Sequence, residues 1–171
     1  MEDALLPAAD EQRNWMVLHV RPRCEKKVAE FCATRGIYSY LPLLNKKHKY
    51  GARIRVYEIP LFTGYIFALG SRPDSILLRQ NHRVANLLSV LDQATLLNQL
   101  QQIKRALDHQ EAVELFPHLT TGMKVQVRSG PLKGVEGFIQ KLKNKTKIVL
   151  NVDFIQQSVA VEVDAEWLVP I

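Results

Sequence analysis

The feature that most constrains the fold is a change in the spacing of apolar residues near position 108. Up to residue 107, strand-length apolar runs alternate with stretches in which apolar residues recur every three or four positions, as on one face of a helix. From residue 120 to residue 171, apolar and polar residues alternate with a period of two, and short turns separate these runs. The spacing therefore predicts a mixed domain followed by a small all-β domain.

The first part of the chain predicts strands and helices in the order β-α-β-β-β-α-β-α. The expected elements are strand 15–20, a helix between Pro22 and Gly36, two antiparallel strands that meet at 50–52, strand 64–70, helix 73–80, strand 84–90 and a helix after Asp92. This order suits an antiparallel sheet with helices packed on it, so we expect an α+β fold for this part.

The second part contains the stretch VRSGPLKGVEGFI, in which glycines interrupt two expected strands. We expect Gly130 to end the first strand, Gly134 to adopt a positive φ, and Gly137 to allow a bulge or a close backbone approach. A small barrel bends its strands sharply, and these positions permit the bends. The predicted domains are a flexible leader at 1–13, a mixed domain at 14–107, an acidic linker at 108–119 and a β-barrel at 120–171.

Positive charge is concentrated in the first part of the chain. The net charge is +6, and residues 1–107 hold 16 Lys and Arg against 9 Asp and Glu. No acid occurs between Phe31 and Tyr57. Two clusters result: Arg21, Arg23, Lys26 and Lys27 at the first helix, and Lys46, Lys47, His48, Lys49, Arg53 and Arg55 on the expected hairpin. Such clusters neutralise phosphates and predict nucleic-acid contact, and a solvated hairpin that aids solubility is the alternative.

The sequence lacks the motifs of common enzymes. It has no Walker loop, HExxH, GxSxG or CxxC motif. Cys24 lies near His19, but its place on the apolar side of a helix favours packing over nucleophilic chemistry. His82 and His118 have no partner at metal-ligand spacing. We therefore expect a protein that is not an enzyme and binds no cofactor or metal.

Cysteine use and hydropathy bear on the compartment. The two cysteines make no disulfide framework, no apolar stretch reaches the length of a membrane span, and the N-terminus lacks a signal-peptide pattern. These observations predict a cytoplasmic protein of a reducing compartment, with no membrane contact.

An aromatic stretch follows the expected hairpin. The side chains of this signal are Tyr57, Pro60, Leu61, Phe62, Tyr65 and Phe67. Tyr65 and Phe67 share one face of a strand because successive side chains alternate. These residues belong either to the core, which composition favours, or to an exposed apolar pocket for a helix of a partner.

Four segments occur in a characteristic order. They are WMVLHVRPRCEKKVAE at 15–30, PLFTGYIF at 60–67, VRSGPLKGVEGFI at 127–139 and FIQQSVAVEVDAEWLVPI at 154–171. Together they resemble the NusG family of transcription elongation factors, in which an NGN domain precedes an SH3-like KOW barrel. The segments EKKVAE and VEVDAEWLVPI are similar to the UpxY-type paralogues, which are antiterminators of surface-polysaccharide operons.

The resemblance implies a monomeric factor that binds RNA polymerase and promotes processive transcription or antitermination, in this case of a specific operon. The NGN domain would dock on the clamp helices of the largest subunit through an apolar pocket. By position in the motif, this pocket comprises Phe62, Tyr65 and Phe67, with Pro60 and Tyr57 beside them.

The same resemblance implies further partners. Arg21, Arg23, Lys26 and Lys27 would face the non-template DNA strand, and nascent RNA is a further candidate partner. The KOW barrel would recruit a ribosomal protein or the Rho terminator through Phe154, with Ile155 next to it.

One position departs from the family motif. Thr63 stands where the motif has a second proline, so we expect a less rigid turn into the following strand. The alternative function is a KOW-type RNA-binding or ribosome-associated protein, because KOW motifs also occur in ribosomal proteins. The PLFTGYIF segment argues against that alternative.

Overall fold

The computed structural model describes residues 4–109, 112–142 and 144–171, and the chain divides into two compact units. Residues 7–93 form one unit, and residues 94–171 with the N-terminal residues up to Leu6 form the other. The division between the units falls at the start of a helix, fourteen residues before the predicted end of the mixed domain. The predicted domain boundaries concern which parts of the chain fold independently, and they remain a prediction.

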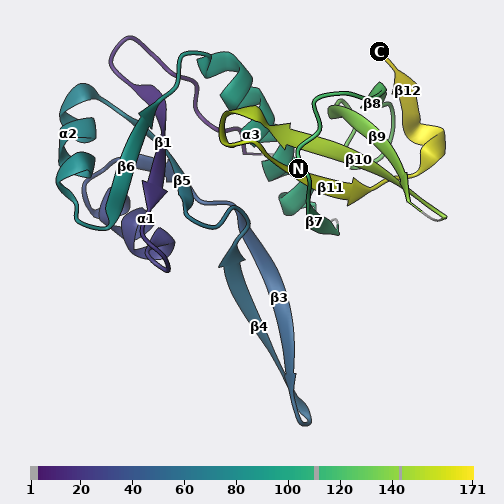
Figure 1. Cartoon of the computed structure of the whole chain (residues 1–171), viewed down its shortest axis with the longest axis horizontal. Helices are drawn as coiled ribbons and strands as arrows, with labels where there is room; N and C mark the ends of the chain where they lie inside the picture. The colour runs from purple at the N-terminus through teal and green to yellow at the C-terminus, as the bar shows by residue number, and fades with distance from the viewer. Residues whose placement is uncertain (1–3, 110–111, 143) are drawn as a thin grey trace. The chain divides into compact units, whose positions relative to one another are not determined.

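The unit of residues 7–93 is built on a four-stranded antiparallel sheet (Figure 1). Its strands, in spatial order, are β2 (Tyr38–Tyr40), β5 (Tyr65–Gly70), β1 (Asn14–Val20) and β6 (Val84–Ser89). Strand β1 is central, and Val17 pairs with Phe67 on one side and with Leu88 on the other. Residues Trp15 to Leu18 are all buried, which explains why the apolar residues of this strand are consecutive rather than alternating.

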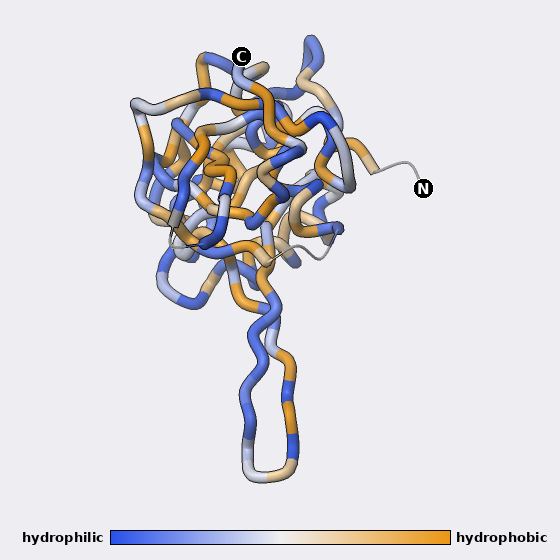
Figure 2. The backbone as a smooth tube through the Cα atoms, turned by 90° about the vertical axis from the view of Figure 1, so that its right-hand side faces the viewer, coloured by the Kyte–Doolittle hydropathy of each residue, from blue (hydrophilic) through white to orange (hydrophobic). Residues whose placement is uncertain are grey.

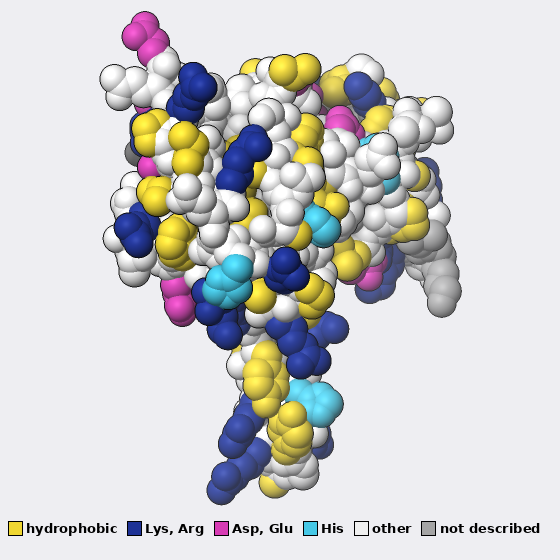
Figure 3. Space-filling model, turned by 60° about the vertical axis from the view of Figure 1, so that its left-hand side comes forward, with side chains coloured by type: hydrophobic (Ala, Val, Ile, Leu, Met, Phe, Trp, Pro, Cys, Tyr) yellow, Lys and Arg dark blue, Asp and Glu magenta, His cyan; other side chains and the backbone are white. Residues whose placement is uncertain are grey.

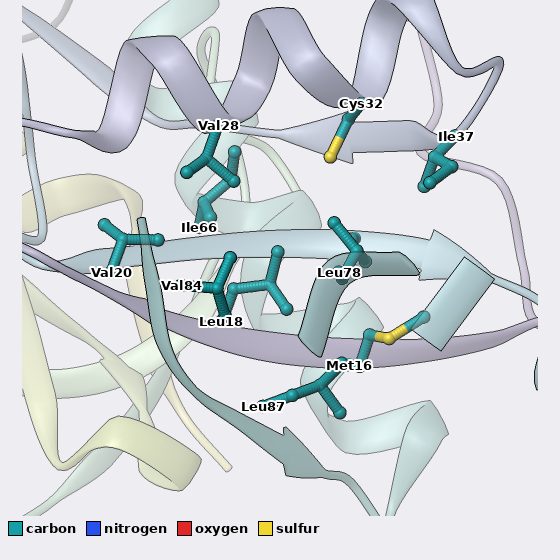
Figure 4. Packing of buried hydrophobic residues seen from close by; sticks show 11 residues of the cluster. Met16, Leu18, Val20, Val28, Cys32, Ile37, Ile66, Leu78, Val84 and Leu87 are labelled. Atoms are coloured by element: carbon teal, nitrogen blue, oxygen red, sulfur yellow. The ribbon is translucent and has the colours of Figure 1, made fainter. Parts of the chain in front are cut away.

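Two helices cover one face of this sheet. They are α1 (Glu25–Thr34) and α2 (Arg72–Gln80), and the core lies between them and the sheet (Figure 4). The labelled side chains come from all three parts: Met16, Leu18, Val20, Ile66, Val84 and Leu87 from the sheet, Val28 and Cys32 from α1, Ile37 after α1, and Leu78 from α2. The shared core fixes the position of both helices on the sheet.

Local signals set the helix ends. Gly36 follows α1 with φ +69°, the left-handed conformation predicted for its C-terminal end. At α2, the Ser71 hydroxyl accepts a hydrogen bond from Asp74 N, and the Asp74 carboxylate accepts one from Ser71 N. This reciprocal pair satisfies two backbone donors at the start of the helix.

Strands β3 (Leu43–Tyr50) and β4 (Arg53–Pro60) form a separate two-stranded sheet, called the ribbon below, that projects from the unit (Figure 1). The chain reverses at Gly51, whose φ is +58°, and Ala52, as predicted. All residues from 45 to 58 are exposed. One strand of the ribbon is almost uniformly hydrophilic, while hydrophobic residues alternate with hydrophilic ones along the other (Figure 2).

The other unit contains helix α3 (Gln93–Asp108), apart from its first residue, and a six-stranded antiparallel sheet. In spatial order the strands are β12 (Leu168–Pro170), β8 (Lys124–Val127), β9 (Glu136–Leu142), β10 (Lys145–Val152), β11 (Gln157–Glu162) and β7 (Val113–Phe116). Two short 3₁₀ helices, η1 (Asp153–Ile155) and η2 (Ala165–Trp167), join the last strands. The predicted fold class, an α+β domain followed by an all-β region, is confirmed.

Strand β7 arises inside the segment predicted as an acidic linker. Its Val113 is buried and pairs with Val161 of β11. This strand is only four residues long, VELF, which is too short for its period to predict a strand within an acidic segment. None of the helices in the described ranges has the length and apolar character needed to cross a membrane.

Candidate functional site

The turn that carries the PLFTGYIF motif is held by hydrogen bonds from several parts of its unit. Leu61 N donates to Pro42 O at 2.9 Å, and Val20 N donates to Gly64 O at 2.8 Å. Thr63 itself is exposed. Backbone hydrogen bonds to neighbouring segments therefore hold the turn in place, although the second proline of the family motif is missing.

Glu25, which is not among the predicted site residues, also anchors this turn. The Glu25 side chain is 4% exposed, and its Oε1 accepts a hydrogen bond from Gly64 N at 2.9 Å. Gly64 has φ +87°, a conformation that favours glycine. The spacing of Glu25, Val28 and Cys32 on α1 is i, i+3, i+7, which places the acid on the buried side of the helix and could have identified it.

The five predicted polymerase-docking residues do not share one exposed surface. Phe62 and Phe67 are buried, with 1% and 0% of their surface exposed. Tyr65 is half-buried, and the centroid of its ring lies 5.3 Å from the centroid of the His19 ring. Pro60 is also half-buried, whereas Tyr57 is exposed on the ribbon. Phe62 and Phe67 are core residues in this structure, and a docking role for the group stays a prediction.

The basic cluster at α1 is partly fixed by hydrogen bonds. Arg21 Nε donates to His82 O at 2.7 Å, and Lys26 Nζ donates to Glu58 O at the base of the ribbon at 2.6 Å. Arg23 adopts φ +62°, which is uncommon for a residue other than glycine. Arg23 and Lys27 are exposed. The cluster therefore adjoins the segment at His82 on one side and the ribbon on the other.

The second basic cluster lies on the ribbon, where its side chains are exposed to solvent. Its cations are Lys46, Lys47, Lys49, Arg53 and Arg55, all exposed. Within the described residues, none of these cations forms an ion pair with a carboxylate. Hydrophobic side chains stand among the Lys and Arg side chains along the ribbon (Figure 3).

The predicted partner contact of the β-rich unit lies on η1. Phe154 is 40% exposed, whereas its neighbour Ile155 is buried. Asp153 at the start of η1 is bound from two sides: Gln99 Nε2 donates to its Oδ2 at 2.7 Å, and His118 Nε2 lies 3.0 Å from its Oδ1. Of the predicted pair, only Phe154 presents a substantial apolar surface, and Ile155 anchors the loop.

The three glycines of VRSGPLKGVEGFI occupy distinct places. Gly130 and Gly134 have φ +82° and +91°. A Cβ at Gly130 would lie 2.4 Å from Trp167, and one at Gly137 would lie 2.3 Å from the carbonyl oxygen of Val149. Each glycine is therefore required by backbone conformation or by close approach.

Cys32 is a poor candidate for a reactive site. Both cysteines are free, and burial raises the pKa of the Cys32 thiol to about 11. A thiol with so high a pKa is protonated near neutral pH and is a poor nucleophile. In the described parts of the chain, no three His, Cys, Asp or Glu side chains gather in a way that could hold a metal ion.

Comparisons with known proteins bear on the family. The family described as "Transcription termination factor nusG" matches residues 13–118. Among solved structures, the chain is similar to a chain of the "Crystal Structure of MjSpt4:Spt5 complex conformation B", with 12% identity and a TM-score of 0.30 over 92% of this chain and 96% of that chain. No curated protein sequence matches it. The family match covers more than half of the chain, which therefore belongs to the NusG family of transcription factors.

Proposed function

We propose that this chain binds RNA polymerase through residues 14–107 and promotes processive transcription or antitermination. The observation that carries the proposal is the NusG family match over residues 13–118, which spans that whole segment. The resemblance of EKKVAE and VEVDAEWLVPI to UpxY-type paralogues supports a role at a specific operon.

The docking surface that we propose for the polymerase clamp helices is centred on Tyr65. Its ring packs beside His19, and it follows a turn that Glu25 and the backbone of β1 hold in place. A pre-ordered aromatic side chain at a surface is a frequent binding hot spot because little conformational entropy is lost on binding. Phe62 and Phe67 then act from the core by supporting the turn and the strand.

The proposed mechanism needs no chemical step. A factor that binds the closed, elongating polymerase more tightly than an open or paused state shifts the equilibrium towards elongation by that difference in affinity. The exposed cations Arg23 and Lys27 and the ribbon would add contacts to phosphates, the non-template DNA strand being the first candidate. These contacts hold the factor in register on the complex.

The β-rich unit supplies the proposed second contact. We assign it the role of a KOW barrel that recruits a ribosomal protein or a termination factor through Phe154, which is 40% exposed on η1. Covalent linkage to a polymerase-bound domain raises the effective concentration of this unit near its partner. Phe154→Ala should then abolish recruitment without changing polymerase binding, whereas Met123→Ala, which removes another exposed apolar side chain, should leave recruitment intact.

The polymerase contact is tested with Tyr65→Ala in the full chain. Binding to core RNA polymerase is measured by co-purification and by titration, after circular dichroism has established that the variant is folded. Loss of a hot-spot aromatic typically weakens binding by about tenfold or more. Leu91→Ala is the matched control, because Leu91 is 98% exposed in the same unit and has no assigned role.

The outcomes separate this function from its alternative. If Tyr65→Ala binds polymerase as well as wild type does, the docking surface is wrong. If the wild-type chain binds structured RNA in a salt-sensitive way and has no affinity for polymerase, the RNA-binding alternative replaces the proposal.

A further inference from the structure

The two faces of the ribbon differ in chemistry, and the pairing register shows how. In an antiparallel pair, directly opposite residues share a face, and successive residues point to opposite faces. Lys46 lies opposite Tyr57, His48 opposite Arg55, and Tyr50 opposite Arg53; these six residues form what we call the aromatic face. Lys47 lies opposite Val56, and Lys49 opposite Ile54; these four form the aliphatic face.

Contacts within the aromatic face support this assignment. The Tyr57 hydroxyl donates to the Tyr50 hydroxyl at 3.3 Å, and the rings of His48 and Tyr50 are 4.6 Å apart at an interplanar angle of 61°. Tyr50 and Tyr57 are nevertheless 54% and 41% exposed. The aromatic face is therefore a continuous row of rings and cations that remains open to solvent.

Packing in the buried core does not explain these side chains. A two-stranded hairpin is marginally stable by itself, and like charges on neighbouring strands destabilise it further. The ribbon concentrates five cations against one acid, Glu58, and contributes no side chain between residues 45 and 58 to the buried core. A solvated surface has no need of exposed tyrosines, so a ligand better accounts for this composition.

The chemistry of the aromatic face selects one class of ligand. Cations with interspersed aromatic rings are typical of surfaces that bind single-stranded nucleic acid, where unpaired bases stack on the rings and on Arg planes. In a duplex the bases are already stacked on each other, and only base edges and phosphates remain available. A duplex would gain little from the tyrosine rings, because its bases are not free to stack on them.

We propose that the aromatic face of the ribbon binds single-stranded nucleic acid, with unpaired bases stacked on Tyr50 and Tyr57 and phosphates held by Lys46, Arg53 and Arg55. The proposal rests on the nucleic-acid contact proposed above for the basic ribbon, but not on the polymerase docking of Tyr65. Lys26 from α1 donates to Glu58 O at the base of the ribbon, which ties this end of the ribbon to the other basic cluster.

The test measures the affinity of the full chain for fluorescently labelled oligonucleotides by anisotropy. The probes are one mixed sequence as single-stranded RNA, the same sequence as single-stranded DNA, and the corresponding DNA duplex. We expect both single strands to bind more tightly than the duplex, and the ratio between RNA and DNA identifies the source of the strand.

Matched pairs of variants on the two faces show which face of the ribbon binds the oligonucleotide. Tyr50→Leu/Tyr57→Leu should weaken single-strand binding by about tenfold or more, because stacking on aromatic rings is lost. Ile54→Ala/Val56→Ala, on the opposite face, should have little effect. Arg53→Gln/Arg55→Gln should weaken binding much more than Lys47→Gln/Lys49→Gln, although each pair removes two positive charges.

A conservative variant tests whether a loss of binding comes from unfolding of the ribbon and not from loss of the aromatic rings. Tyr50→Phe/Tyr57→Phe keeps both rings and removes the hydroxyl hydrogen bond, so it should bind nearly as well as wild type. Equal losses from the two charge pairs, tighter binding of the duplex, or loss of binding in the Phe variant would each overturn the proposal. If the wild-type chain binds no oligonucleotide, the nucleic-acid contact fails as well, while polymerase docking is decided separately by Tyr65→Ala.

Discussion

Strands β4 and β5 follow each other in the chain and belong to the same unit, yet they lie in opposite environments. In β5, five of the six residues are buried, whereas the first six residues of β4 are all exposed. Ile54 and Val56 of β4 are 64% and 56% exposed, even though the sequence RIRVYE alternates like a half-buried strand. The difference teaches that an alternating pattern predicts a strand but does not predict that either face is buried.

The largest expected effect is a difference in the free energy of unfolding between a variant of β5 and a variant of β4. Phe67→Ala in β5 should lower the free energy of unfolding by about 3–5 kcal/mol, because it removes a fully buried aromatic side chain and leaves a cavity. Val56→Ala in the ribbon should change it by no more than about 0.5 kcal/mol. Urea unfolding of both variants measures the contrast, and similar values for the two would contradict the packing described for β5.

Substitutions at two glycines compare the packed sheet of the β-rich unit with the exposed ribbon. Gly137→Ala should cost about 3 kcal/mol, because the added Cβ would lie 2.3 Å from the carbonyl oxygen of Val149, which is backbone and cannot turn away. At the ribbon tip, Gly51 has φ +58° and no atom within 4 Å of a built Cβ. Gly51→Asn should therefore cost only a few tenths of a kcal/mol, since Asn tolerates this conformation. Thermal unfolding of the two variants checks the ranking.

Much of the fold was predictable because most of its elements carry their own local signals. Helix α1 has a proline before it and a glycine after it, and the ribbon has Gly51 at its reversal. Strand β7 was missed because four residues are too few for a period to stand out, and its place in the sheet depends on β11, about 45 residues later. Long-range pairing of this kind has no local signal.

The candidate site was less predictable than the fold. Position in a family motif identified Phe62 and Phe67 but could not tell that both are core residues in this chain. The two faces of the ribbon depend on the register of β3 against β4, and a shift of one residue would exchange every side chain between them. Charge counts therefore located the basic ribbon but could not separate its faces.

Glu25, which accepts the hydrogen bond from Gly64 N in the turn before β5, gives an intermediate effect. Glu25→Ala should cost about 2 kcal/mol, because the buried Gly64 N–H loses its acceptor. Glu25→Gln keeps an amide oxygen at that place and should cost less. Hydrogen exchange at the Gly64 amide is the sharper readout: it should speed up in the Ala variant, and unchanged protection would show that the bond is not important for the turn.

The smallest expected effect concerns the hydrogen-bonded carboxylate of Asp153 in the β-rich unit, and the comparison is with Arg53 on the ribbon. Burial tends to raise the pKa of Asp153, but hydrogen bonds from His118 and Gln99 outweigh it and hold this pKa below its ordinary value of 3.8. Because the folded-state pKa is the lower one, the stabilisation is fully present above the unfolded-state pKa and is lost as the pH falls through the folded-state value. The Asp153 side chain is 55% exposed, so solvent screening limits the contribution to less than about 1 kcal/mol.

Asp153→Asn should therefore lower the urea midpoint slightly near neutral pH, and the difference from wild type should shrink as the pH falls below about 3.8. Arg53→Gln on the ribbon is the control, because no carboxylate in the described ranges pairs with Arg53 and its removal should leave the acid dependence unchanged. A difference between Asp153→Asn and wild type that stays constant over this pH range would mean that Asp153 stabilises η1 through geometry and not through its charge. If Arg53→Gln alters the pH dependence of the urea midpoint, Arg53 interacts with a titrating group of the folded protein. The ribbon charges would then contribute to stability as well as to ligand binding.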